Sequence, residues 1–211
     1  MQWLVLGLIL LLGVHSVRIV AEEWRTQTIE RIGVAAWKSA YALLSLLGLA
    51  LVIWGYGLAR QQPVVLWTPP TAARHVAALL NLPAMVLLVA AYVPGNALKV
   101  RLHHPMVLGV KLWALAHLLA NGNLADLLLF GGFLVWAVLN YRAARQRGLL
   151  PTDGHRADAA DDDEPGDTDP DPRHPVSLPA TVATVVVGLA VWAALAFGLH
   201  ATLFGVAPLG R

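Results

Sequence analysis

The chain has 211 residues, of which 57% are hydrophobic and only 13% are charged. Its apolar residues come in long runs, without the amphipathic spacing of soluble helices, which indicates an all-α integral membrane protein. The absence of cysteine excludes disulfides, thiolate metal ligands, covalently attached haem and iron–sulfur clusters. The formal charge of +2 is spread over the ends of the apolar runs, so the sequence predicts no nucleic-acid-binding surface.

Six apolar segments predict a six-helix transmembrane bundle. A helix needs about 20 apolar residues to cross a bilayer, and most segments approach that length. The fourth and fifth segments are short and are joined by a tight turn at residues 121–123. Gly48 and Gly55, seven residues apart, predict a close approach of another helix to the second span. In chain order the predicted spans are Gln2–Val17, Ser39–Ala59, Val76–Pro94, Pro105–Ala120, Leu124–Asn140 and Leu178–Val206.

Basic residues between the spans predict the orientation of the bundle. The loops after the first, third and fifth spans hold most of the lysine and arginine, whereas the opposite loops hold only Arg60 and Arg74. Because positively charged loops stay in the cytoplasm, we expect both termini on the opposite, periplasmic side. The first segment lacks the basic flank and cleavage pattern of a signal peptide, so we expect it to be retained as a helix.

The segment 150–177 differs in composition from the rest of the chain. Nine of the thirteen acidic residues lie between Asp153 and Asp171, among several prolines. Such a segment cannot bury enough apolar surface to fold, so it predicts a disordered linker. The predicted domain organisation is therefore a five-span membrane domain at 1–149, the linker at 150–177, and a sixth span of the same membrane domain at 178–211.

Five of the eight histidines lie in or at the ends of the predicted spans: His15, His75, His104, His117 and His200. Ionisable side chains are costly inside a membrane and usually hold a ligand, find a partner or face a bundle interior. Because these five come from four different helices, they favour a shared cofactor over five separate helix contacts. Haem b is the predicted cofactor, since it is flat and apolar and takes imidazole axial ligands. Zinc is the rival metal and needs three or four converging ligands.

The depth of each histidine in the bilayer limits which of them can pair. The predicted topology places His15 and His104 near the cytoplasmic face, and His75, His117 and His200 near the outer face, at about 1.5 Å per helical residue. Two ligands of one haem must flank the same ring, which favours His117 with His200 or His75. In the alternative interpretation, His104 and His75 only cap helices at the interface, since Pro105 suits a first helical position.

Two basic residues are further candidates for holding the cofactor. Lys111 lies within the fourth span, where it could snorkel to the interface, pair with Asp126 at the start of the fifth span, or meet a haem propionate. Arg101, after the third span, is the other basic candidate for cofactor binding.

The run HHPMVLGVKLWALAHLLANGNLADLLLFGGFLVWAV, from His103 to Val138, resembles the core signature of the NnrU family of bacterial membrane proteins. Shorter motifs also resemble that family and follow in its order. They are GVHSVR near residue 15, VIWGYGLAR at Val52–Arg60, LWTPPTAARH at Leu66–His75 and AAYVPG at Ala90–Gly95. The resemblance covers nearly the whole chain except the acidic linker.

This resemblance implies a protein of the bacterial inner membrane that is linked to denitrification and to nitrite and nitric oxide metabolism. The family is also similar to the plant and cyanobacterial zeta-carotene isomerase, a membrane protein with a histidine-ligated b-type haem. By motif, that similarity implies His15 in GVHS and His117 in LWALAH as the metal ligands. A third histidine of the isomerase falls near Trp136, and this chain has none there.

Residues and resemblance together predict a protein that binds haem b through His117 and a second histidine, with a redox or nitric-oxide-linked role. Its predicted partners are membrane lipid and a membrane reductase or another redox protein. One alternative is a haem-free scaffold or assembly factor for a membrane reductase. Another is a haem-dependent cis–trans isomerase of a polyene lipid. Whether the protein is an enzyme is left open by the sequence.

Overall fold

The computed structural model of the protein describes residues 1–147 and 176–209. Within these ranges the chain is helical, and its one β-type pairing is an isolated antiparallel bridge between Val65 and Asn123. The predicted all-α membrane class is therefore confirmed. The predicted linker at 150–177 falls outside the described residues, except for Val176 and Ser177.

Five helices in the described part of the chain are long and apolar enough to cross a membrane, which makes this a multi-pass membrane protein. Each reaches or approaches the length of about 20 residues that a bilayer requires. The last of them is interrupted by a single π-helical turn, η2. They are α1 (Gln2–Val20), α3 (Val34–Gln61), α4 (Thr71–Tyr92), α7 (Leu124–Arg147) and the composite helix Leu178–Phe204, made of α8 (Leu178–Ala194), η2 (Leu195–Leu199) and α9 (His200–Phe204).

The fourth predicted span is the helix α6 (Pro105–Ala120), and it is shorter than the others. It is an apolar helix of 16 residues in which Lys111 and His117 are the ionisable side chains. At 1.5 Å per residue they extend about 24 Å, whereas the hydrocarbon core of a bilayer is about 30 Å thick. The described residues thus contain five helices of spanning length where the sequence predicts six spans, and α6 accounts for the difference.

Two further helices occupy segments that the sequence leaves as loops. The first is α2 (Glu22–Ile32), a polar helix between α1 and α3. Two glutamates occupy its first turn, where the partial positive charge of the helix terminus stabilises them. It ends at Gly33, whose φ of +83° is a conformation that favours glycine. The second is α5 (Ala97–Leu102), a short helix between α4 and α6.

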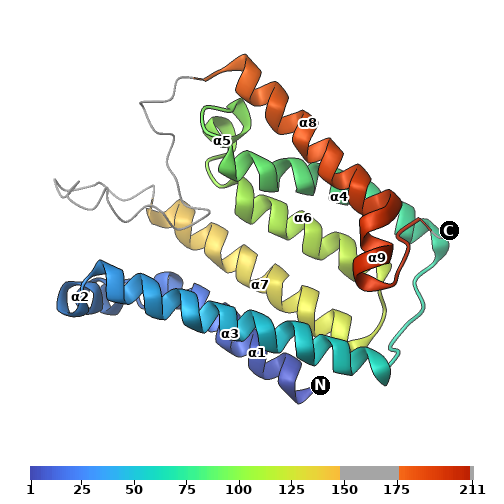
Figure 1. The fold of residues 1–211 in the computed structure, drawn as a ribbon, viewed down its shortest axis with the longest axis horizontal. Coiled ribbons are helices and arrows are strands. Elements are labelled where there is room, and N and C mark those ends of the chain that lie inside the picture. The colour runs from blue at the N-terminus through green and yellow to red at the C-terminus, as the bar shows by residue number, and fades with distance from the viewer. Residues whose placement is uncertain (148–175, 210–211) are drawn as a thin grey trace. The chain divides into compact units, whose positions relative to one another are not determined.

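The helices fall into two compact units. The first unit comprises Met1–Thr68 and Gly122–Gly148 and contains α1, α2, α3 and α7. The second comprises Pro69–Asn121 and Leu149–Arg211 and contains the remaining helices. In the first unit α1 packs against both α3 and α7. In the second, α4 packs against α6 and α8, with the three helices side by side (Figure 1).

Glycines hold α1 against α3 in the first unit. A Cβ atom added at Gly48 would lie 2.8 Å from the backbone nitrogen of Leu11, and one added at Gly55 would overlap the backbone nitrogen of Leu4. Leu4 is fully buried and belongs to the apolar core of this unit. The close helix approach predicted from Gly48 and Gly55 is therefore confirmed, and α1 is the helix that approaches.

In the second unit α8 is fixed to α4 by one glycine and one hydrogen bond. A Cβ atom at Gly188 would lie 2.6 Å from the Cα atom of Val86 on α4. One turn further along α8, the indole Nε1 of Trp192 donates to the carbonyl oxygen of Ala78 at 2.9 Å. Because α6 also packs on α4, residues carried by α6 and by the end of the composite helix are held in one unit.

Replacing Asn96 with alanine is expected to destabilise the second unit by about 2–4 kcal/mol. Asn96 is fully buried, and its Nδ2 donates to the carbonyl oxygens of Ala90 at 2.8 Å and of Val93 at 2.5 Å. Its Oδ1 caps α5 by accepting from the Lys99 backbone nitrogen at 2.9 Å. Alanine would leave all three groups without this partner. Thermal unfolding in detergent measures the loss, and Gln27→Ala on the exposed face of α2 is the control. An equal change in both variants would contradict the prediction.

Candidate imidazole site

Two histidines from different helices lie close together in the second unit. His117 lies in the last turn of α6, and His200 is the first residue of α9. Their ring centroids are 6.4 Å apart, and the ring planes are inclined by 29°. Both side chains are half-buried. The predicted depths favour pairing His117 with His200 or with His75, and the structure places His200 beside His117.

Main-chain carbonyl groups orient both rings. The Nδ1 atom of His117 lies 2.8 Å from the carbonyl oxygen of Trp113, and the Nδ1 atom of His200 lies 2.7 Å from that of Val206. A carbonyl oxygen can only accept a hydrogen bond, so Nδ1 carries the proton in the neutral ring and Nε2 carries the lone pair. Histidines that bind metals usually donate their other ring nitrogen in this way.

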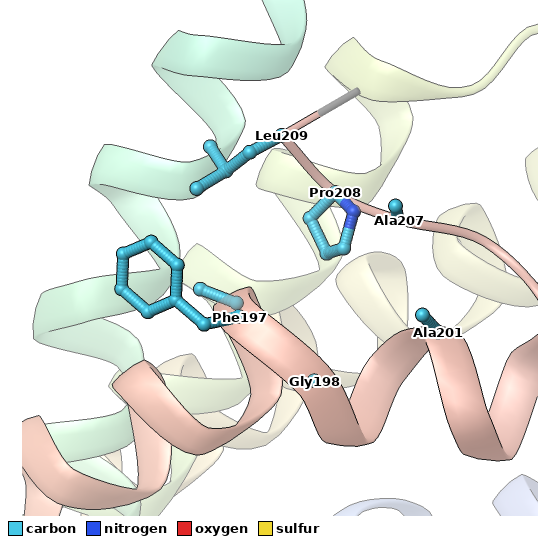
Figure 2. Close-up of a pocket in the computed structure, with 7 residues that line it drawn as sticks. Phe197, Gly198, Ala201, Ala207, Pro208 and Leu209 are labelled. Carbon is cyan, nitrogen blue, oxygen red and sulfur yellow. The ribbon is translucent and has the colours of Figure 1, made fainter. Parts of the chain in front are cut away.

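The chain reverses after α9, and this reversal supplies the carbonyl group that orients His200. The π-helical turn η2 directly precedes His200, and α9 ends at Gly205 in the left-handed conformation with φ +69°. The chain then runs back beside the helix. Figure 2 shows Pro208 and Leu209 of the returning segment opposite Phe197. Between them lies a cavity of about 30 Å³, which has room for one or two water molecules and not for a large ligand.

Aromatic rings flank both imidazoles. The Trp113 ring centroid lies 5.1 Å from that of His117, and the Phe204 ring centroid lies 4.9 Å from that of His200. Trp113 and His117 are one helical turn apart on α6, and His200 and Phe204 are one turn apart on α9, so the i, i+4 spacing of the sequence produces both contacts. The two histidines consequently lie in apolar, aromatic surroundings.

His15 has a similar environment in the first unit. Its Nδ1 lies 2.8 Å from the carbonyl oxygen of Leu11, which favours the same tautomer. Its ring centroid lies 5.2 Å from that of Tyr41 and 6.1 Å from that of Trp136, the position where the isomerase similarity would place a third histidine. A cavity of about 110 Å³ adjoins Tyr41. Its lining is apolar and aromatic: Val14, Val17, Trp24, Trp37, Ala40, Tyr41 and Leu44.

The other sequence-predicted residues lie apart from the imidazole pair or at helix ends. His104 is the N-cap residue of α6 and Pro105 is its first residue, as the capping interpretation predicts by position, but the His104 side chain makes no capping hydrogen bond. The capping interpretation is wrong for His75, because α4 begins at Thr71 with Pro70 as its N-cap residue and His75 lies in its second turn with the side chain exposed. Arg101 is exposed on α5. Lys111 is half-buried on α6.

The donor chemistry of the imidazole pair suits iron in haem better than zinc. In the described residues no group of three or more histidine, aspartate or glutamate side chains is placed to hold a metal ion, as a zinc site would require. The cavities described above, of about 30 and 110 Å³, are smaller than a porphyrin needs, since ligand pockets typically measure about 300 Å³ or more.

A second polar cluster, which sequence reasoning missed, surrounds Asp126 in the first unit. The Tyr56 hydroxyl donates to Oδ1 of Asp126 at 2.5 Å, and the Asn123 side-chain amide donates to Oδ2 at 3.0 Å. Asp126 is only 4% exposed. The one signal in the sequence was Asp126 itself, an acidic residue inside an apolar run. Nothing in the local sequence indicated Tyr56, which lies on another helix, as its partner.

Comparison with known protein families supports the motif resemblance. A family model described as NnrU protein matches residues 3–208, almost the entire chain. Neither the curated proteins nor the solved structures contain a match to this sequence. The matched region includes α1 to α9 and therefore both units. This chain belongs to the NnrU family.

Proposed function

We propose that this NnrU-family membrane protein binds haem b through His117 and His200 and has a redox or nitric-oxide-linked role in nitrogen oxide metabolism. The observation that carries the proposal is the pair of imidazoles 6.4 Å apart, each with Nδ1 against a main-chain carbonyl oxygen. That arrangement leaves Nε2 of each neutral ring as the atom with the lone pair.

The chain's own residues would orient the ligands and exclude water. The carbonyl groups of Trp113 and Val206 hold the two rings and raise the basicity of Nε2. The rings of Trp113 and Phe204 cover the imidazoles with apolar surface, which lowers the local dielectric constant and so influences the reduction potential. When bound, haem supplies one-electron chemistry and a metal that takes diatomic ligands.

His15 is the alternative second ligand. The isomerase similarity implies His15 with His117, and His15 has the same contact between Nδ1 and a main-chain carbonyl oxygen. Because His15 belongs to the first unit and His200 to the second, substituting each in turn distinguishes the two pairings.

Optical spectra of the purified protein test the proposal. We expect a Soret band in the oxidised protein, a shift of that band and sharp visible bands on reduction, and a further shift when nitric oxide is added to the reduced protein. Haem should be extracted in stoichiometric amounts by pyridine. A preparation from haem-sufficient cells that lacks a Soret band, and stays without one after haem is added, would refute haem binding.

A haem-free scaffold or assembly factor for a membrane reductase is the second candidate function. It is favoured by the small size of the two described cavities. In this case the protein would be colourless, and replacing His117 and His200 would change the recovery of a reductase partner without removing any chromophore. The same spectra therefore separate the two functions.

We also propose that the protein resides in the bacterial inner membrane with both termini in the periplasm, an orientation that requires α6 to cross the membrane as a short sixth span. The support is the excess of lysine and arginine after α1, after α4 and at the end of α7. In this orientation the imidazole pair, at the C-terminal end of α6, lies toward the periplasm.

A further inference from the structure

We propose that the aromatic cavity of the first unit binds an acyl chain of one anionic phospholipid, whose phosphate group lies among the basic side chains at the same end of the unit. The cavity is the one of about 110 Å³ that adjoins Tyr41. The proposed haem ligands His117 and His200 belong to the second unit, so this inference does not rest on haem binding.

The lining of this cavity suits a hydrocarbon chain. It consists of aliphatic and aromatic side chains from α1, α2 and α3, and no charged side chain contributes to it. On α3 the lining runs from Trp37 to Leu44, which is about 10 Å along the helix axis at 1.5 Å per residue. Water in such a cavity would lack hydrogen-bond partners, whereas hydrocarbon makes van der Waals contacts with the lining.

Surface exposure of the lining residues gives a chain access to the cavity. Trp24, Ala40 and Leu44 all line the cavity and are exposed. A chain can therefore enter from the surrounding bilayer without separating the helices. Leu47, about one turn beyond Leu44 on α3, is also exposed and extends the apolar surface for the rest of the chain.

The position of the cavity in the unit corresponds to the boundary between hydrocarbon and headgroups. Val17 lies three residues before the end of α1, and Trp37 is the fourth residue of α3. The ring centroid of Trp24, on the polar helix α2, lies 5.9 Å from that of Trp37. Tryptophan side chains concentrate at this level of a bilayer. An acyl chain in the cavity therefore belongs to a lipid whose headgroup lies near α2.

Basic side chains surround this headgroup level. Arg18, Arg25 and Lys38 each follow a lining residue directly in the sequence. Arg18 and Arg25 both form ion pairs with Glu22, at 3.6 and 3.4 Å. The helix α7 ends at the same place, because Nη1 of Arg147 donates to the carbonyl oxygen of Arg18 at 3.4 Å.

The described residues at this end of the unit carry an excess of positive charge. Seven of their side chains are basic and three are acidic: Arg18, Arg25, Arg31, Lys38, Arg142, Arg145 and Arg147, against Glu22, Glu23 and Glu30. Such an excess attracts an anionic headgroup more strongly than a zwitterionic one. Guanidinium groups also match the oxygens of a phosphate group, to which they can donate two hydrogen bonds. Apolar lining and basic surroundings together favour an anionic phospholipid as the occupant.

Native mass spectrometry of the full chain in detergent tests the proposal. The protein is titrated with phosphatidylglycerol and, separately, with phosphatidylcholine that has the same acyl chains. We expect one phosphatidylglycerol molecule to bind per chain, at least about fivefold more tightly than phosphatidylcholine, since one lysine or arginine near an anionic lipid contributes about that factor. An excess of inorganic phosphate should not displace the lipid, because phosphate has no acyl chain.

Two matched pairs of variants locate the bound lipid. Ala40→Trp fills the cavity with an indole ring and should remove the one-to-one complex, whereas Ala42→Trp adds the same ring at an exposed position of α3 outside the lining and should retain it. Lys38→Gln should lower the affinity for phosphatidylglycerol about fivefold. Arg74→Gln removes an exposed cation on α4 of the second unit and should leave that affinity unchanged.

Three results would overturn the proposal. Equal affinities for the two lipids would refute the role of the basic side chains. Equal effects of Ala40→Trp and Ala42→Trp would refute binding in the cavity. Displacement of the lipid by inorganic phosphate would show that the site binds an anion without a chain. Should Ala40→Trp fail to fold, phosphatidylglycerol with short and with long acyl chains is compared on the wild type, where equal affinities would again refute the cavity.

Discussion

At the proposed haem site, His117→Ala and His200→Ala are each expected to lower haem occupancy at least tenfold and to change the absorption spectrum. The reason is that each substitution removes one of the two imidazoles that would hold the haem, and even the loss of a residue that only orients a ligand typically costs tenfold to a hundredfold in metal affinity. Absorption spectra and haem-to-protein ratios measure both effects.

Two matched variants make this prediction specific. His75→Ala removes an exposed histidine on α4 and should leave the spectrum unchanged. Trp113→Phe keeps the main-chain carbonyl group that accepts from His117 and should retain haem, with at most a shifted potential. If His15→Ala removes the chromophore while His200→Ala does not, the ligand pair is His15 with His117, and the assignment to His200 is wrong.

Gly55→Ala is expected to be the most disruptive single-methyl change at the contact between α1 and α3, at about 3 kcal/mol or more. The new Cβ atom would overlap the backbone nitrogen of Leu4 and approach the carbonyl carbon of Trp3 to 2.6 Å. Backbone atoms cannot rotate away as a flexible side chain can, so α1 would have to separate from α3. That movement would break the close backbone packing that holds helices together in membranes, where apolar burial adds little.

The control for this prediction lies on the same helix. A Cβ atom added at Gly57 meets nothing within 4 Å. Gly57→Ala should therefore keep the packing and raise stability by up to about 1 kcal/mol, because alanine favours the helix. The yield of monodisperse protein and the midpoint of thermal unfolding in detergent measure both variants. Equal behaviour of the two would show that the contact between Gly55 and Leu4 does not govern folding.

The sequence predicts the membrane helices well because hydropathy over a long window depends little on tertiary contacts. The starts of α6 and α7 agree with the predicted starts of the fourth and fifth spans, Pro105 and Leu124. The polar helix α2 escaped prediction because it has no long apolar run. Its stability as a helix depends on capping and on its neighbours, which composition does not report.

The candidate site could be predicted only in part. The charge pattern of the loops gave the depth of each histidine and favoured a pairing of His117 with His200 or His75, and the structure places His200 beside His117. The pairing of Tyr56 with Asp126 could not be predicted, because it depends on how α3 and α7 are rotated about their own axes. Hydropathy determines which helices enter the membrane but not these rotations.

The π-helical turn η2 links the length of the chain to the direction in which His200 faces. A π turn contains one more residue than an α turn, and each residue of a helix advances its direction by about 100°. The extra residue therefore determines the direction, about the helix axis, in which the side chains from His200 to Phe204 point. A deletion or insertion within 195–199 would turn the His200 imidazole away from His117, although both histidines would still be present in the sequence. The number of residues in this turn is therefore itself a determinant of the site.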